Sequence, residues 1–441
     1  MVLDKNIPRY NLGYVIRETD IQADTLRAWE RRYGVPSPQR SEGGHRLYSE
    51  RDIETLRWLM QQQKEGLSIS KAVDLLKELQ TEGKDPLTLP GEVPPAIVLE
   101  TPDIAKLREE WIDAARNFDN ARSDHIMSIA FANYPIKVVL AEVLQKGLVQ
   151  IGDQWYRGKT TIQQEHFCSE LAIRRLHALI AAAPAPLQPD RILIALPAGE
   201  EHEVAPLMLA LLLRYAGWDV IYLGANVPTL QLETTLEQLK PRLVILSAEL
   251  LPAAASLLQT ARFINDRNIR LAFGGAIFNR LPELRERIPG HFIGESIEEA
   301  LQVIDTLLLK NLPTPFTKEL PEPYQDVMNN FQRNLPHIET VLNQKMLNSS
   351  ISHQTLQEYN RYFADVITAA LSLGDINYAH HDIHWVHHLI GHHKMKPSSL
   401  LFYLRSYRDT LNEVLGRSVQ IITDWLESNL YQLAQPERAK A

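Results

Sequence analysis

The chain has 441 residues, which predicts about three domains, and its net charge is −8. Hydrophobic residues make up 45% and charged residues 23%, and apolar runs stay well short of the ~20 residues of a membrane span, so we expect a cytoplasmic protein without a membrane partner. The single cysteine, Cys168, excludes a disulfide framework and a cysteine-based zinc site.

The acidic net charge argues against nucleic-acid binding, because phosphate contacts need Lys and Arg. Its distribution changes that conclusion. Residues 27–46 hold five arginines against two glutamates, so the basic charge is concentrated in one short N-terminal stretch.

That basic stretch begins in a pair of predicted short helices, at about residues 12–18 and 22–33, and the second stops at Gly34. Its apolar face carries Leu26 and Trp29. The residues that we assign to DNA on its polar face are Thr25, Arg27, Arg31 and Arg32. A short arginine-rich helix after a tight turn suits insertion into a major groove.

A hairpin is predicted next, at residues 40–48, with Gly43 and Gly44 in its turn. The hairpin residues that we assign to phosphates beside the groove are Arg40, His45, Arg46 and Tyr48. Ser49, with Asp52 three residues later, predicts the capped start of another helix. The alternative is a solvated charged helix followed by a surface hairpin.

The ordered series TLRAWERRYG, PxR, GGHRxYS and RDIETL resembles the winged helix-turn-helix of MerR-family regulators over about residues 9–79. The resemblance implies a double-stranded DNA operator with two-fold symmetry, and a dimer or higher oligomer that reads it.

Pro-rich stretches at residues 81–103 and 312–324 divide the rest of the chain. We predict a multi-domain fold with these parts: a winged helix-turn-helix over 1–80, a linker over 81–103, a helical bundle over 104–185, an α/β domain over 186–311 and a C-terminal helical bundle over 325–435.

Strands and helices alternate in the α/β domain, which predicts a parallel sheet with helices on both faces. The expected strands are 191–196, 220–223, 243–247, 271–273 and 292–294. The expected helices are 206–216, 229–239, 253–264 and 296–309.

A histidine flanked by carboxylates, His202, follows the first of these strands. Ligands of open α/β sheets bind at that end of the strands. Glu200 can accept a hydrogen bond from one ring nitrogen of His202 and leave the other for a metal. One histidine is too few for a free ion, but it suffices for a metal with four equatorial ligands, as in a corrin. The alternative is an exposed loop histidine.

Further strand ends carry Leu223 and Gly224, Ser247, and the pair Gly274 and Gly275. With the loop of His202 they resemble the flavodoxin-like cobalamin-binding fold, which implies that His202 ligates cobalt and that these residues contact the cofactor. Two departures are Ala205, where the motif has glycine, and Glu249, where an apolar residue is usual.

The helical bundle holds Trp155 and, after nine further residues, Glu165 and His166. This spacing resembles the cap of CarH/LitR-type photoreceptor regulators. The whole resemblance to that group covers about residues 9–310. The resemblance implies adenosylcobalamin under the three side chains, and a light-responsive repressor that acts as a dimer or tetramer. Tyr156 departs from the pattern, because the best-known light sensors of this group have a cobalt-binding histidine there.

The C-terminal segment concentrates histidines between residues 380 and 393. In a helix His380, His384, His387 and His388 share one face, which is metal-ligand spacing. One interpretation is a metal, haem or pH-sensing site. The other is a polar helix face, with Ile383, Val386 and Ile390 toward a bundle core.

We therefore expect a transcription regulator rather than an enzyme. A regulator that has lost cobalamin and answers to a partner or another ligand is the alternative. A cobalamin-dependent mutase or methyltransferase is remote, because it needs a substrate barrel of about 250 residues, which the C-terminal segment cannot supply.

Overall fold

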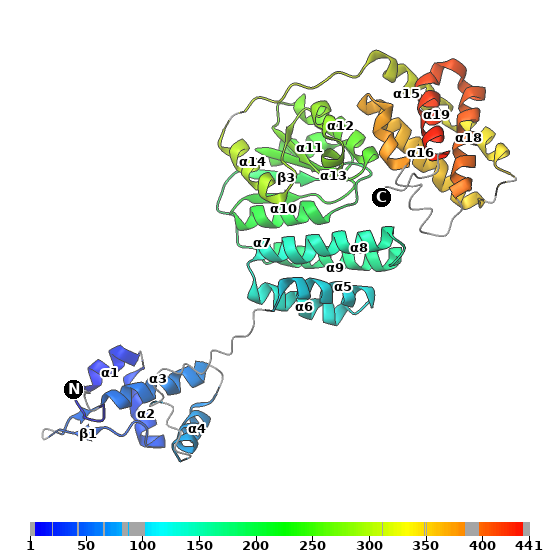
Figure 1. The fold of residues 1–441 in the computed structure, drawn as a ribbon. Coiled ribbons are helices and arrows are strands. Elements are labelled where there is room, and N and C mark those ends of the chain that lie inside the picture. Colours follow the sequence, from blue (N-terminus) through cyan, green and yellow to red (C-terminus); the bar gives the residue numbers. More distant parts are fainter. Residues whose placement is uncertain are drawn as a thin grey trace. The chain divides into compact units, whose positions relative to one another are not determined.

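The computed structural model describes residues 5–19, 21–41, 44–64, 67–81, 87, 102–310, 312–347, 349, 351–383 and 397–434. The chain divides into two compact units, residues 1–100 and residues 101–441 (Figure 1). Within the described ranges, no helix is long and apolar enough to cross a membrane.

The first unit contains helices around a small hairpin. Its elements are α1 Leu12–Thr19, α2 Ala23–Tyr33, β1 Gln39–Arg40, β2 Arg46–Leu47, α3 Glu50–Lys64 and α4 Ile69–Thr81. Helix α2 ends at Gly34, which has a left-handed φ of 71° and donates its N–H to the Glu30 carbonyl. Ser49 and Asp52 exchange hydrogen bonds at the start of α3. Both helix boundaries agree with the sequence prediction.

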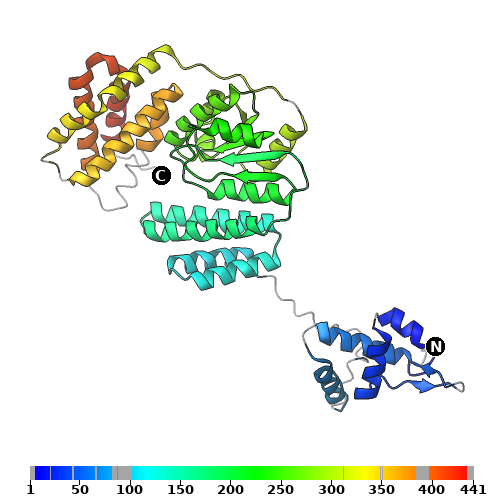
Figure 2. The ribbon, with the colours of Figure 1, turned by 180° about the vertical axis from the view of Figure 1, so that it is seen from behind.

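A helical cap begins the second unit. Its elements are α5 Ile104–Arg116, α6 Asn120–Asn133, α7 Ile136–Val139, the π-helical turn η1 Leu140–Gln145, α8 Lys146–Tyr156 and α9 Ile162–Ala181. Trp111 is buried in its core, and the same core includes Leu207 and Leu211 of the next helix, α10. The cap therefore packs directly on the α/β domain, as the adjacent ribbons show (Figure 2).

The sheet is parallel throughout. Its strands are β3 Arg191–Ala195, β4 Asp219–Tyr222, β5 Leu243–Ser247, β6 Leu271–Gly274 and β7 His291–Phe292. The strands lie side by side in the order β4-β3-β5-β6-β7, which is the flavodoxin-like arrangement. From β3 the chain first adds β4 on one side and then crosses over to add β5 on the other side. In such a sheet the crevice for a ligand opens where the strand order reverses, at the carboxyl ends of β3 and β5.

Helices cover both faces of the sheet, as predicted. They are α10 Val204–Tyr215, α11 Leu232–Leu239, α12 Leu251–Asn265, α13 Ala276–Arg280, the 3₁₀ turn η2 Pro282–Arg287 and α14 Ile297–Leu309. Leu209 of α10 and Ile304 of α14 share one core, whereas Leu236 of α11 and Leu257 of α12 share another. Helix α11 starts three residues later than predicted, because Gln231 adopts a left-handed φ of 67° that interrupts the helix.

The C-terminal bundle comprises α15 Glu322–Lys345, α16 His353–Leu373, the 3₁₀ turns η3 Ile376–Ala379 and η4 Gly416–Val419, α18 Pro397–Leu415 and α19 Gln420–Ala434. Its buried residues form one hydrophobic core with those of α12 and α13. The bundle thus packs against the α12 side of the α/β domain (Figure 1).

The histidine-rich segment is described only in part. His380 lies 2.7 Å from Oδ1 of Asn429 through its Nδ1, and Ile383 is buried, as the polar-face interpretation predicts. His384, His387 and His388 lie outside the described residues. Among the described residues, no group of three or more His, Cys, Asp or Glu side chains could hold a metal ion.

Candidate cofactor and nucleic-acid sites

The loop after β3, residues 197–203 (hereafter the axial loop), carries the predicted pair of Glu200 and His202. Nδ1 of His202 lies 2.6 Å from Oε1 of Glu200, and the Glu200 side chain is only 1% exposed, whereas that of His202 is 56% exposed. A carboxylate only accepts hydrogen bonds, so Nδ1 of His202 carries a proton, and in the neutral ring the lone pair is on Nε2. The ring is thus prepared as a ligand on its exposed side.

Backbone donors hold the buried Glu200 carboxylate. The N–H groups of Glu201 and His202 each donate to Oε1 at 2.9 Å, and the N–H of Glu249 donates to Oε2 at 2.6 Å. Burial raises the pKa of Glu200, but the hydrogen bonds from His202 and Glu249 outweigh it, and the net pKa is lowered. The hydrogen bond to Glu200 raises the pKa of His202.

The turn after β4 supports the axial loop. Asn226, with a left-handed φ of 55°, accepts the Gly199 N–H through its side chain at 2.9 Å and donates its own N–H to the Glu200 carbonyl at 3.0 Å. The Leu196 N–H donates to the carbonyl of Gly224. The Gly224 carbonyl therefore lies next to the end of β3, just before the axial loop, and the assignment of Leu223 and Gly224 to the cofactor stays a prediction.

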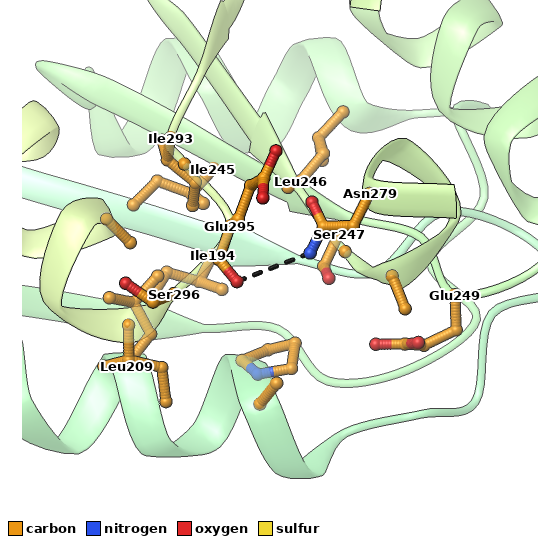
Figure 3. A pocket seen from close by; sticks show the side chains of 18 of the residues that line it. Ile194, Leu209, Ile245, Leu246, Ser247, Glu249, Asn279, Ile293, Glu295 and Ser296 are labelled. Atoms are coloured by element: carbon orange, nitrogen blue, oxygen red, sulfur yellow. Dashed lines mark hydrogen bonds between the residues drawn. The ribbon is translucent and has the colours of Figure 1, made fainter. Parts of the chain in front are cut away.

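A cavity of about 170 Å³ lies at the carboxyl ends of β3, β5 and β6 (Figure 3). Ser247, Gly274 and Gly275 line it, together with Ala205 and Glu249, the two departures from the motif. A Cβ atom on Gly275, where φ is 115°, would lie 2.0 Å from the Ala248 carbonyl oxygen. The missing side chain of Gly275 thus lets the turn after β6 approach the Ala248 backbone beside the cavity.

One of the predicted cap residues, Glu165, lies within electrostatic range of His202. A capping box of Thr161 and Gln164 starts α9, which fixes Glu165 and His166 in the first turn. Nδ1 of His166 lies 3.1 Å from Oε2 of Glu165, and the charge of Glu165 acts on His202 to raise its pKa. The cap therefore places Glu165 within electrostatic range of the axial loop.

Trp155 and Tyr156 are the last two residues of α8 and are half-buried. A short connection leads from them to the start of α9 at Ile162. Burial raises the pKa of the Tyr156 phenol, so this side chain stays neutral at ordinary pH. A neutral phenol is a poor substitute for the imidazole that the light sensors of the resembling group carry at this position.

Most of the residues assigned to DNA are exposed on the first unit. These are Thr25, Arg27, Arg31, Arg32, Arg40 and His45. Arg46 is half-buried, and its Nε donates to Glu30 at 2.9 Å. The assignment therefore stays a prediction for these residues, with Arg46 partly committed to α2.

The assignment of Tyr48 to phosphate is wrong. Its side chain is fully buried, and its hydroxyl donates to Oε1 of Glu30 at 2.5 Å. Since β2 alternates its side chains, Arg46 and Tyr48 face the same way, and both meet Glu30. Glu30, which in the sequence only offsets the nearby arginines, joins the hairpin to α2 through these two hydrogen bonds.

Sequence reasoning missed other supporting groups. Glu249 holds Glu200 through its backbone N–H, which no side-chain pattern reveals. The Tyr222 hydroxyl donates to Oε2 of Glu203 at 2.8 Å and ties β4 to the end of the axial loop. Asn226 had a usable signal, because asparagine after a Gly-Ala pair favours a left-handed turn.

Family models match three parts of the chain. One described as "MerR HTH family regulatory protein" matches residues 10–79, and two described as "B12 binding domain" match residues 107–180 and 190–304. These ranges contain the first unit's helices, the cap and the sheet. They define a transcription regulator with a cobalamin-binding sensor.

Curated relatives agree with that class. The HTH-type transcriptional repressor CarH of Myxococcus xanthus is 31% identical over 290 residues, 65% of this chain and 95% of that protein. The repressor CarA of the same organism is 33% identical over 236 residues, 53% of this chain and 74% of that protein. The chain belongs to the MerR-family, cobalamin-binding regulators that include CarH and CarA.

Among solved structures, the monomethylamine corrinoid protein of Methanosarcina barkeri is similar to part of the chain. The sequence identity is 17% and the TM-score 0.40, over 46% of this chain and 98% of that one.

Proposed function

We propose that this regulator is a light-responsive repressor that senses adenosylcobalamin, with Nε2 of His202 as the lower ligand of cobalt. The observation that carries the proposal is the buried Glu200 carboxylate 2.6 Å from Nδ1 of His202, at the point where the strand order reverses. A carboxylate behind a metal-binding histidine fixes the ring's tautomer and raises its basicity.

The residues around this pair fit a corrinoid. The cavity beside Ser247, Gly274 and Gly275 is lined by apolar side chains and a few polar ones, such as Asn279 and Ser296, which suits the nucleotide tail of the cofactor. Trp155, Glu165 and His166 would cover the upper face. The cofactor itself supplies a cobalt–carbon bond that light can break.

Tyr156 bears on the lit state. Its phenol stands where the resembling sensors carry a histidine for cobalt, so that histidine-stabilised state is absent here. We propose instead that Trp155 and Glu165 would hold the cap in place only while the upper ligand is bound. Without that ligand the cap repacks on α10, and the assembly changes.

DNA binding would follow the assembly. The exposed arginines of α2 suit a major groove, and a two-fold operator needs at least two copies of the first unit. If the dimer or tetramer forms with only one cofactor state, light changes the fraction of the protein that is assembled. The fraction bound to DNA changes with it.

An absorption experiment tests the proposal. The purified chain is mixed with adenosylcobalamin in the dark, separated from free cofactor by gel filtration, and scanned before and after illumination. We expect the wild type and the control His125→Ala, an exposed histidine of α6, to retain the corrinoid, and His202→Ala to lose it or to show an altered spectrum. A wild-type chain that elutes without corrinoid overturns the proposal in favour of a regulator without cobalamin.

The light response has a separate readout. Size-exclusion chromatography and DNA mobility shifts of the loaded protein, dark and illuminated, should show a smaller assembly and weaker DNA binding after illumination. Unchanged assembly and binding would contradict light sensing while leaving cobalamin sensing intact.

A further inference from the structure

Glu249 connects the axial loop to helix α13. Its N–H donates to Oε2 of Glu200 at 2.6 Å, and its carbonyl accepts a hydrogen bond from Nη2 of Arg280. Its carboxylate takes part in a further hydrogen bond with the backbone of Ala276. The residue that holds the buried carboxylate is therefore itself held by both ends of α13.

The segment formed by α13 and η2 lies between the cavity and the C-terminal bundle. Ala276 and Asn279 line the cavity, whereas Ile277 and Phe278 belong to the core that the bundle shares. At the far end the Arg287 side chain hydrogen-bonds with Tyr378 in η3 of the bundle. Its Nη1 also donates to the Glu319 carbonyl, just before α15, at 2.6 Å. This segment thus contacts the cofactor site on one side and the bundle on the other.

The bundle carries a half-buried acid, Asp382, within electrostatic range of Arg280. The Tyr362 hydroxyl donates to Oδ1 of Asp382 at 3.0 Å. Burial raises the pKa of Asp382, and the hydrogen bond from Tyr362 and the charge of Arg280 oppose that rise. The Arg280 charge also acts on Tyr362, so the guanidinium lies within electrostatic range of both bundle residues.

We propose that Arg280 is a positioning residue for the axial histidine, and that the C-terminal bundle controls it through Asp382. The inference rests on the proposed function. A change in the bundle would reach the histidine through a series of residues: Asp382, Arg280, the Glu249 backbone, Glu200 and His202. A bundle that shifts Asp382 redirects the guanidinium and moves residue 249. Glu200 then loses the backbone donor on Oε2, and the His202 ring loses its fixed orientation.

The bundle is by this route a second input to the corrinoid site. Groups behind a metal-binding histidine typically change metal affinity about 10–100-fold when they are removed. Arg280 acts one step further away, so we expect the lower end of that range.

The test uses the full-length chain with Arg280→Gln, Arg280→Lys and Asp382→Asn. The matched control is Arg262→Gln, which removes the same charge from an exposed position on α12. The first readout is hydrogen exchange of the Glu249 and His202 amides without cofactor. The second is adenosylcobalamin affinity, and the third is the axial-nitrogen splitting in the electron paramagnetic resonance spectrum of the cobalt(II) form.

We expect Arg280→Gln and Asp382→Asn to accelerate exchange at both amides, to weaken affinity about 10-fold and to diminish the nitrogen splitting. Arg280→Lys should restore much of each signal, because an ammonium also donates to the Glu249 carbonyl. Arg262→Gln should match the wild type.

Exchange and nitrogen splitting that stay at wild-type values in Arg280→Gln and Asp382→Asn overturn the inference. A wild type that binds no corrinoid overturns the proposed function instead, and amide exchange still decides the role of Arg280. If Arg280→Gln fails to fold, Asp382→Asn carries the comparison, because it leaves Arg280 in the chain and removes only the bundle charge that we propose orients it.

Discussion

Nδ1 of His202 lies 2.6 Å from Oε1 of Glu200, an exposed ring against a carboxylate that is 1% exposed. The acid is buried where it can act only on its neighbours, and the base is exposed where it can meet a ligand. Backbone donors from two loops stabilise the charged acid. The protein's own hydrogen bonds therefore hold the pair in place.

Glu200→Gln should weaken adenosylcobalamin binding about 10–100-fold, as is typical when the partner of a metal-binding histidine is lost. The amide nitrogen of the new glutamine is a donor, so it would face N–H groups that now donate to the carboxylate, and those hydrogen bonds would be lost. Spectroscopic titration measures the effect. Glu201→Gln, an exposed neighbour, is the control, and equal affinities for the two variants would refute the role of Glu200.

Gly275→Ala should lower the stability of the second unit by at least about 2 kcal/mol, because φ is 115° and the new Cβ would overlap the Ala248 carbonyl. Thermal unfolding and corrinoid retention both report the change. Gly152→Ala, a helical glycine with nothing within 4 Å of its built Cβ, should leave stability equal or slightly higher. Equal melting temperatures for both variants would contradict the steric argument.

Tyr48→Phe should destabilise the first unit by about 1–2 kcal/mol, because the part-buried Glu30 carboxylate loses a hydrogen-bond donor. Hydrogen exchange of the α2 amides measures this loss. Tyr33→Phe serves as the control on the same helix. The Tyr48→Phe variant should still bind DNA at a low temperature, where it is fully folded. A loss of DNA affinity under those conditions would show that the Tyr48 hydroxyl contacts DNA.

Arg31→Ala should weaken binding to a random-sequence duplex and reduce the salt dependence by about one unit of slope, without loss of stability. The exposed position of Arg31 on α2 is the reason. Fluorescence anisotropy at several salt concentrations measures both quantities. Lys71→Ala, an exposed cation of α4, should leave the slope unchanged, and equal slopes in both variants would remove Arg31 from the interface.

Local signals explain why much of the fold was predictable. Gly34 and the Ser49–Asp52 pair mark helix ends through backbone geometry that any fold must satisfy. The alternation of apolar strands and helices between 190 and 309 leaves a parallel sheet as the natural solution. Tyr48 shows the limit, because an aromatic residue beside arginines looks available until the hairpin is folded against α2.

By itself the sequence determined the motifs: the arginines of α2, the Glu200–His202 pair and the small residues at the strand ends, because each depends on spacing along the chain. Only the tertiary structure decided which residues support these motifs. The Glu249 N–H reaches Glu200, and the C-terminal bundle shares a core with the sheet's helices, across long separations in sequence. Such contacts arise from packing between distant segments, which no local pattern encodes.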